Sequence, residues 1–187
     1  MSTRERLVQA TRALLWERGY VGTSPKAIQQ QAGAGQGSMY HHFSGKPELA
    51  LAAIEASAGE LRRAAESALD GPGTAHARVA AYLLRERDAL RGCPVGRLTM
   101  DPDVFASAEL RAPVDELFDW LRGRLASVVR EGVAAGELAP ELDPERTAAT
   151  IAATVQGGYV LARASGTADG FDAAVRGLLD LLAPPAN

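Results

Sequence analysis

The residues with the clearest chemical potential lie close together near the N-terminus. Gln36 and Ser38 carry amide and hydroxyl groups that can hydrogen-bond the edges of bases in a DNA groove. Gly37 stands between them, and a glycine there lets the backbone approach another molecule closely. These residue types at this spacing predict a surface that reads DNA bases.

A helix-turn-helix is the expected support for these residues. Ser24 followed by Pro25 is a typical helix start, so one short helix is expected over 25–32. The glycine-containing turn at 33–35 precedes a second short helix at about 36–42. Two short helices joined by such a turn are typical of a helix-turn-helix, which places its second helix in the major groove.

Groups that can hold phosphates flank the base-reading residues. The hydroxyls and free N–H groups at the start of the first short helix can bind one phosphate, and a lysine at the start of the next helix can bind another. Tyrosine and histidine side chains on the second short helix can reach others. The residues predicted to contact DNA are Thr23, Ser24, Lys26, Gln36, Gly37, Ser38, Tyr40, His41, His42 and Lys46.

The distribution of charge favours the same interpretation. The 187-residue chain has a formal net charge of −3. Residues 1–50 nevertheless contain six basic and three acidic side chains, including both lysines, whereas the remaining residues contain 14 basic and 20 acidic ones. This asymmetry predicts a basic head that meets a polyanion and an acidic body that does not, although chance can also produce an excess of this size.

Apolar spacing predicts helices throughout the chain. Hydrophobic residues make up 47% of the sequence and aromatic residues only 5%, and alanine is abundant, which favours closely packed helices over strands. The cleanest apolar stripe, from Val114 to Val129, repeats at helical spacing. Further helices are expected over about 74–91, 145–164 and 171–182. The predicted fold class is all-α with about nine helices.

Other chemistries lack the residues that they need. Cys93 is the single cysteine, which excludes an intrachain disulfide, and the adjacent His41 and His42 point about 100° apart on a helix with no third metal ligand nearby. No nucleophile-elbow, zinc-protease or Walker motif occurs. We therefore expect no enzyme, catalytic residue, cofactor or metal. Without a signal-peptide or membrane-spanning stretch, we expect a cytoplasmic protein with no membrane partner.

Residues 4–54 resemble the N-terminal signature of the TetR family of bacterial transcriptional regulators. The resemblance implies a three-helix DNA-binding domain at 1–45, a helical ligand-binding and dimerisation domain at 46–187, and a homodimer on a double-stranded DNA operator with two-fold symmetry. It also implies that the start of the second short helix reads bases, while the tyrosine, histidine, lysine and hydroxyl groups hold phosphates. The matching positions are Gly19-Tyr20, Thr23-Ser24, Ile28, Ala32-Gly33, Gly37-Ser38-Met39-Tyr40-His41-His42-Phe43, Lys46 and Leu49.

Two positions depart from the family pattern. Gln29 stands where a small alanine is usual, which puts the packing between the two short helices in question. Ala34-Gly35 replaces the commoner Val-Ser, so the expected N-cap serine of the second short helix is missing. Glycine in that role costs roughly a few tenths of a kcal/mol, so the departure weakens the helix start without removing it.

The helical body is expected to bind a small-molecule effector between its helices. The scarce large side chains are the natural lining of such a pocket, with one glutamine as a polar anchor, although each of them can equally be plain core. The segments 92–96 and 157–159 are similar to regulators related to the lincomycin- and flavonoid-responsive repressors, which implies an aromatic or polycyclic effector. The predicted effector-binding residues are Tyr82, Met100, Phe105, Phe118, Trp120, Gln156 and Tyr159.

The last two long helices are expected to form the homodimer. Their glycines and alanines permit close approach of two backbones, and the leucines of the final helix offer more apolar area than a single stripe needs. A core within one chain is the alternative interpretation. The predicted dimer residues are Ile151, Thr154, Gly157, Gly158, Leu161, Val175, Leu178 and Leu182.

The leading hypothesis from the sequence is a homodimeric DNA-binding repressor that a small molecule releases from its operator. A helical small-molecule-binding protein with a vestigial helix-turn-helix is one alternative, and an activator of the same fold is another. A helical enzyme is the third, but the sequence offers no acid–base constellation for it.

Overall fold

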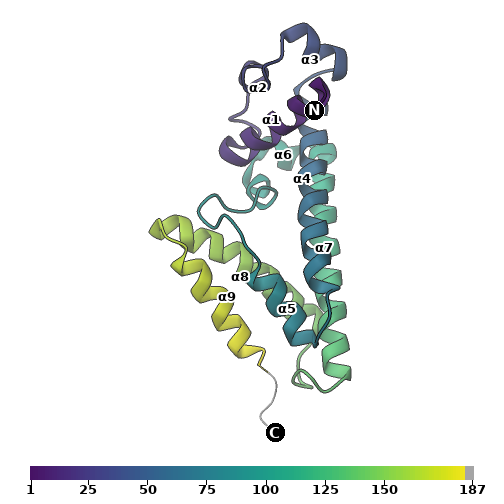
Figure 1. Cartoon of the computed structure of the whole chain (residues 1–187), viewed down its shortest axis with the longest axis vertical. Coiled ribbons are helices and arrows are strands. Elements are labelled where there is room, and N and C mark those ends of the chain that lie inside the picture. The colour runs from purple at the N-terminus through teal and green to yellow at the C-terminus, as the bar shows by residue number, and fades with distance from the viewer. Residues whose placement is uncertain (184–187) are drawn as a thin grey trace. The chain divides into compact units, whose positions relative to one another are not determined.

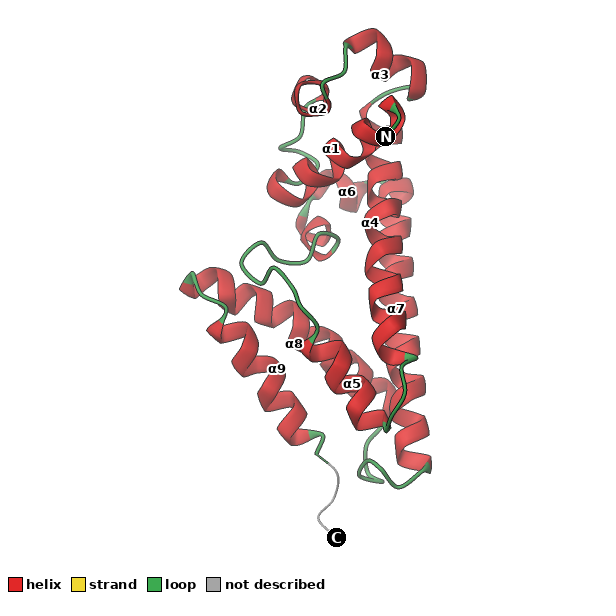
Figure 2. Cartoon of the chain, in the orientation of Figure 1, coloured by secondary structure: helices red, strands yellow, loops and turns green. Residues whose placement is uncertain are grey.

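The computed structural model describes residues 1–183, and all regular structure in that range is helical (Figure 1, Figure 2). The predicted all-α class with nine α-helices is confirmed for the described residues. None of these helices combines the length and the apolar character needed to cross a membrane. The elements are α1 Thr3–Arg18, α2 Pro25–Ala32, α3 Gln36–His42, α4 Lys46–Leu69, α5 Ala75–Leu84, the 3-10 helix η1 Gly96–Met100, α6 Pro102–Ala106, α7 Ala108–Ala134, α8 Pro144–Ser165 and α9 Asp169–Leu181.

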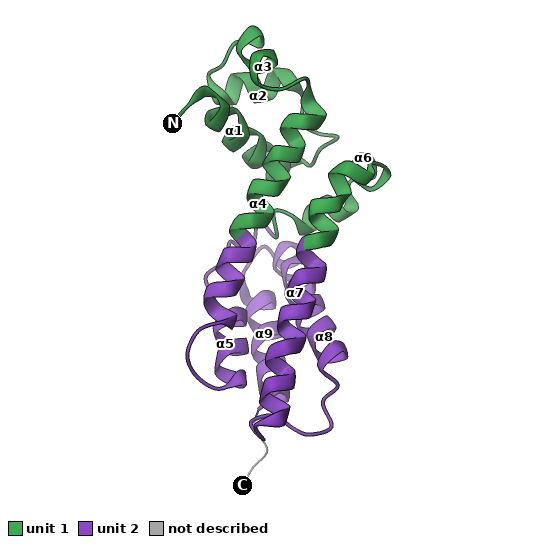
Figure 3. Cartoon of the chain, turned by 90° about the vertical axis from the view of Figure 1, so that its right-hand side faces the viewer, with its two compact units in different colours: residues 1–60, 93–116 green, residues 61–92, 117–187 purple. Residues whose placement is uncertain are grey.

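The chain divides into two compact units, coloured green and purple in Figure 3. Unit 1 consists of residues 1–60 and 93–116, and unit 2 consists of residues 61–92 and 117–187. Unit 1 therefore joins the three N-terminal helices and the start of α4 to η1, α6 and the start of α7. The predicted division of the chain into functional domains at residue 45 remains a prediction.

Helix α1 is defined by a cap at each end. Ser2 and Glu5 form a capping box, in which each side chain accepts a hydrogen bond from the backbone N–H of the other residue. Gly19 ends the helix with a φ of 75°, and its N–H donates to the carbonyl of Leu15. The buried face of α1, which includes Leu14, packs against α2 and α3. This helix therefore supports the two short helices of the predicted DNA-binding motif.

In unit 2, α8 and α9 pack against each other and α9 also packs against α5. Gly158 permits the close approach of α8 to α9, because a Cβ atom there would lie 2.8 Å from Cδ2 of Phe171. The rings of Tyr159 and Phe171 are 4.9 Å apart between centroids, so the same contact contains an aromatic pair. These residues form a core within the chain itself.

Helix α5 is shorter than the helix predicted over 74–91. Arg85 follows it with extended dihedral angles, φ −57° and ψ 149°. The guanidinium of Arg87 then donates to the carbonyls of Tyr82 and Leu83, at 2.5 and 2.7 Å. A continuing helix would need these carbonyls as acceptors for its own N–H groups, so the arginine side chain takes the place of another turn.

Candidate nucleic-acid interface

Helix α2 begins and ends as its sequence predicts. The Oγ of Ser24 accepts a hydrogen bond from the N–H of Ala27, and Pro25 occupies the first turn, where its missing N–H is not needed. Gly33 ends the helix in the left-handed region with a φ of 58°. The chain then needs only two residues to start α3 at Gln36. The two helices thus have the connection of a helix-turn-helix.

Helix α3 has a polar face exposed to solvent, and one buried methionine packs it against the rest of unit 1. Gln36 and Tyr40 are exposed, and Met39 between them is fully buried. The Nε2 of Gln29 lies 3.6 Å from the sulfur of Met39, so this unusual residue of α2 contacts the anchor of α3. The concern that Gln29 disturbs the packing of the short helices therefore finds no support. The other predicted DNA-contacting residues of α3 are exposed (Gly37, His41) or half-buried (Ser38, His42).

The start of α3 has the weak cap expected from its sequence. Gly35 is the N-cap residue and provides no side-chain hydrogen bond to the first turn. Its φ of −72° and ψ of 161° are ordinary extended values, and a Cβ atom there would meet nothing within 4 Å. The helix could therefore accept a capping serine at this position without strain.

The hydroxyl of Thr23 does not fit the predicted role of a phosphate ligand. Its side chain is buried, and Oγ1 donates to the carbonyl of Gly19 at 2.6 Å. The hydroxyl is therefore committed to the turn that follows α1. Ser24 is exposed but also uses its hydroxyl inside the protein, as the N-cap of α2. Lys26, on the first turn of α2, is exposed.

Lys46, at the start of α4, lies over an aromatic ring. Its Nζ is 3.8 Å from the ring centroid of Tyr20, a cation–π contact. Burial lowers the pKa of Lys46, and the carboxylates of Asp103 and Asp101 act in the opposite direction. The ammonium is therefore held in place in unit 1 with part of its surface open to solvent.

Asp101 is a buried polar residue of unit 1 whose full role no sequence motif predicts. Its Oδ2 accepts hydrogen bonds from the backbone N–H groups of Tyr20 and Val21, at 2.7 and 3.0 Å. Its Oδ1 accepts from the N–H groups of Asp103 and Val104, which makes it the N-cap of α6. Only the cap could be inferred from the sequence, since Asp precedes Pro at this position. The contact with the end of α1 links segments about 80 residues apart.

The contact between Asp101 and the end of α1 requires a glycine at position 19. A Cβ atom at this position would lie 2.8 Å from Oδ2 of Asp101, and the backbone φ of 75° disfavours any other residue type. The carboxylate therefore reaches the end of α1 because the chain has no side chain there.

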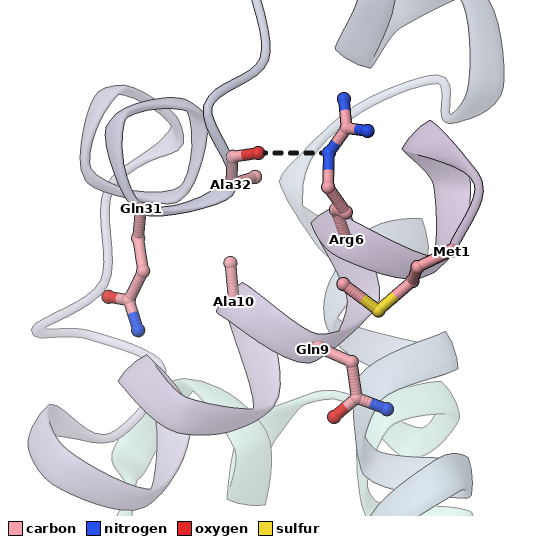
Figure 4. A pocket seen from close by; sticks show the side chains of 6 residues that line it. All are labelled: Met1, Arg6, Gln9, Ala10, Gln31 and Ala32. Carbon is pink, nitrogen blue, oxygen red and sulfur yellow. Dashed lines mark hydrogen bonds between the residues drawn. The ribbon is translucent and has the colours of Figure 1, made fainter.

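Two hollows border the short helices. One, of about 260 Å³, lies between α1 and α2, where the Nε of Arg6 donates to the carbonyl of Ala32 at 3.3 Å (Figure 4). The other, of about 440 Å³, is lined by Lys26, Gln29, Gln30, Gly33, Ala34 and Gly35. Neither hollow includes a predicted effector-binding residue. Arg6 fixes α1 to the C-terminal end of α2, which positions the helix-turn-helix.

The predicted effector-binding residues are distributed over both units. Met100 and Phe105 belong to unit 1 and are 86% and 66% exposed, which is not the burial expected of pocket lining. Tyr82 and Tyr159 are buried in unit 2. Trp120 is half-buried beneath the guanidinium of Arg62, at 4.6 Å from its ring centroid, and Phe118 and Gln156 are also half-buried.

The predicted dimer residues fall into two groups. Thr154 is half-buried, and Gly157 and Leu161 are exposed on α8. The others are buried within the chain, and their part in a dimer stays a prediction. These buried residues are Ile151, Gly158, Val175, Leu178 and Leu182.

Comparison with known proteins agrees with the helix-turn-helix geometry. The family model described as "Bacterial regulatory proteins, tetR family" matches residues 7–53. The model described as "Tetracyclin repressor-like, C-terminal domain" matches residues 74–178, which is more than half of the chain. The protein belongs to the TetR family, and it is a DNA-binding transcriptional regulator.

Individual relatives support this assignment. The transcriptional regulator AcuR of Cereibacter sphaeroides is 32% identical over 139 residues, which span 71% of this chain and 63% of AcuR. A TetR transcriptional regulator from Chloroflexus aurantiacus has a TM-score of 0.85 and 32% identity, with 95% of this chain and 92% of that chain covered. A cysteine mutant of the TetR family regulator CifR, complexed with a 26-bp double-strand operator DNA, has a TM-score of 0.79 and 25% identity, with 95% of each chain covered.

Proposed function

We propose that the protein is a homodimeric repressor that binds a palindromic operator through α3 and is released by a small-molecule effector. The observation that carries this proposal is the polar, exposed face of α3, held by the buried Met39. Gln36, Gly37 and Ser38 open that helix and are the residues proposed to read bases. Tyr40, His42 and Lys46 are the proposed phosphate contacts. A cysteine mutant of the similar protein CifR is known in complex with operator DNA, which supports the same use of this fold.

The proposed dimer surface consists of the exposed apolar residues of α8 and α9. Val160 and Leu161 of α8 are 67% and 51% exposed, and Leu181 of α9 is 83% exposed. Gly157 and Gly177 are also exposed, and neither has an atom within 4 Å of a Cβ added there. Large apolar side chains beside exposed glycines favour close packing with a second copy of these helices.

Substitution at the proposed dimer surface tests the dimer. Leu161→Arg is expected to convert a dimer into a monomer in sedimentation experiments, because a guanidinium would be buried without a partner. Leu84→Arg is the control, since Leu84 is 50% exposed in the same unit but on α5. A monomeric wild-type protein, or a Leu161→Arg protein that remains dimeric, contradicts this surface.

The proposed effector is an aromatic or polycyclic small molecule, as the resemblance to lincomycin- and flavonoid-responsive repressors implies. The buried aromatic side chains of unit 2, which include Tyr82, Tyr159 and Phe171, support this class of ligand. An activator of the same fold remains the alternative to a repressor. A reporter gene behind the operator separates them, because a repressor lowers its expression and an activator raises it.

Footprinting on genomic fragments selected by the protein tests the operator. A dimer with two recognition helices is expected to protect two half-sites in an inverted repeat, with centres about 34–36 Å apart or a multiple of that distance. Protection of a single, non-repeated segment contradicts a two-fold symmetric complex. Failure to select any fragment over bulk DNA contradicts operator binding itself.

A further inference from the structure

Two arginines follow the C-terminal end of α5 in unit 2, and we call Arg85 and Arg87 the arginine pair. The Nη1 of Arg87 donates to the carbonyls of Leu83 and Arg85, at 2.7 and 3.0 Å. Its Nη2 donates to the carbonyl of Tyr82 at 2.5 Å. Arg87 therefore caps α5 with one edge of its guanidinium.

Two aromatic rings lie beside the arginine pair. The Cζ of Arg87 lies 5.2 Å from the ring centroid of Tyr82 and 5.6 Å from that of Phe171. The Cζ of Arg85 lies 5.7 Å from the Tyr82 ring. Tyr159 packs on Phe171, so the pair borders an aromatic cluster from α5, α8 and α9. Such rings favour a cation and an apolar ligand body in the same place.

The arginine pair has no anionic counterpart in the part of the chain that is described. Within residues 1–183, no carboxylate forms an ion pair with either guanidinium. The Nε atoms of Arg85 and Arg87 are buried and lack hydrogen-bond partners. Burial and the neighbouring Arg85 lower the pKa of Arg87, and only the phenols of Tyr159 and Tyr82 act against this.

Helix capping accounts for only part of this arrangement. It explains the hydrogen bonds of Nη1 and Nη2 of Arg87, but it explains neither the buried Nε atoms nor the like charge of Arg85. A buried charge is costly unless it is paired, and a second positive charge beside it adds to the cost. An anion between the guanidinium groups would remove both costs, since guanidinium N–H groups bind carboxylates through paired hydrogen bonds.

We propose that the arginine pair binds the carboxylate of an anionic effector whose apolar body lies beside the aromatic cluster of Tyr82, Tyr159 and Phe171. This inference rests on the proposed function, because it names the chemical class of the effector. The ligand class is a small aromatic or polycyclic carboxylate. A neutral molecule of the same shape would leave the arginine pair without its anion.

Thermal unfolding with matched pairs of small molecules tests the site. The probes are acetate, benzoate and 1-naphthoate, each compared with its neutral amide at an ionic strength equalised with sodium chloride. At least one carboxylate is expected to raise the unfolding temperature more than its amide, because only the carboxylate pairs with the guanidinium groups. Equal effects of all three carboxylates and their amides would overturn the proposal.

Variants that remove one positive charge test whether carboxylates bind at the arginine pair. Arg85→Gln is expected to weaken carboxylate binding about tenfold or more, since a charge-assisted hydrogen bond is lost. Arg122→Gln removes the same charge from an exposed arginine of unit 2 that pairs with Asp119, and is expected to bind like the wild type. Arg87→Lys, which keeps a charge but loses the planar donor fork, is expected to weaken binding as well. Unchanged carboxylate binding by folded Arg85→Gln would overturn the assignment.

A separate measurement distinguishes failure of this site from failure of the proposed function. Binding of the unliganded protein to its selected operator is measured alongside. Operator binding without any carboxylate-specific stabilisation overturns the arginine pair as an effector site and leaves the regulator intact. Carboxylate-specific stabilisation that Arg85→Gln removes, without operator binding, supports the anion site and contradicts the regulator.

Discussion

Two sets of cationic side chains, one in each unit, lie in different environments. In unit 1, Lys26 is exposed on the helix-turn-helix, and Lys46 rests on the Tyr20 ring with part of its surface open. In unit 2, Arg85 and Arg87 have buried Nε atoms and no carboxylate partner among the described residues. Lys26 is thus open to solvent, whereas Arg85 and Arg87 are half-buried and bury their Nε atoms.

This difference indicates different partners. Exposed cations are hydrated and stable without a partner, so they can remain available for a large polyanion such as DNA. Half-buried guanidinium groups lose part of their hydration, which a small anion could replace. The environment of the charge, more than its sign, therefore separates the proposed DNA contacts from the proposed effector contacts.

The largest expected effect concerns the buried carboxylate of Asp101 in unit 1. Both of its oxygens accept hydrogen bonds from backbone N–H groups. Asp101→Ala is expected to lower the free energy of unfolding by roughly 2–4 kcal/mol, because the N–H groups of Tyr20 and Val21 lose their acceptor. Denaturant unfolding measures the loss. Asp103→Ala is the control, since its side chain is exposed. Equal losses for the two variants would show that the Asp101 hydrogen bonds do not stabilise the fold.

A base-reading residue is expected to affect specificity more than general affinity. Gln36→Ala should reduce discrimination at one operator position by about 1–3 kcal/mol, the value of a bidentate contact to a base. A series of operators with single-base changes measures this preference. Gln31→Ala, an exposed glutamine of α2, is the matched control. An unchanged preference across the series would remove Gln36 from the base contacts.

A phosphate contact is expected to affect all DNA sequences alike. Lys46→Ala should weaken binding to specific and unrelated duplexes similarly and reduce the slope of log K against log salt by about 1. Tyr40→Phe should also weaken both, through loss of one hydroxyl. Titrations at several salt concentrations give the slope. A slope equal to that of the wild type would show that Lys46 makes no phosphate contact.

The smallest expected effect concerns the start of α3. Gly35→Ser should increase the free energy of unfolding by roughly a few tenths of a kcal/mol, because the serine Oγ can accept a hydrogen bond from the first turn. Gly33→Ser is expected to destabilise the protein, since its φ of 58° disfavours a side chain. Denaturant midpoints compare the two. Destabilisation by Gly35→Ser would mean that α3 needs its glycine N-cap.

Local signals explain what could be predicted from the sequence. Ser24-Pro25 and Gly33 determine the ends of α2 through neighbouring backbone groups, so both ends were predicted correctly. The contact of Asp101 with Tyr20 and Val21 could not be predicted, because no local pattern records which distant N–H groups a carboxylate will meet.

Apolar periodicity does not show whether a helix face packs within the chain or against a partner chain. It identified α8 and α9 as helices, but a stripe that packs within the chain looks the same as one that meets a partner. Val175 and Leu178 were accordingly predicted as dimer residues and are buried within the chain. Apolar periodicity also predicts too long a helix at α5. The guanidinium of Arg87 donates to the carbonyl of Tyr82, which a further helical turn would otherwise use as an acceptor.

Salt-dependent fluorescence anisotropy on operator and scrambled duplexes tests the central claim, that α3 meets DNA, most directly. Gly37 and Gly123 are exposed helical glycines with no atom within 4 Å of an added Cβ, so a glutamate fits at either position. The wild type and Gly123→Glu are expected to prefer the operator and to bind more weakly as salt rises, whereas Gly37→Glu should lose this binding through repulsion of the phosphates. Equal operator binding by Gly37→Glu and Gly123→Glu would contradict the account.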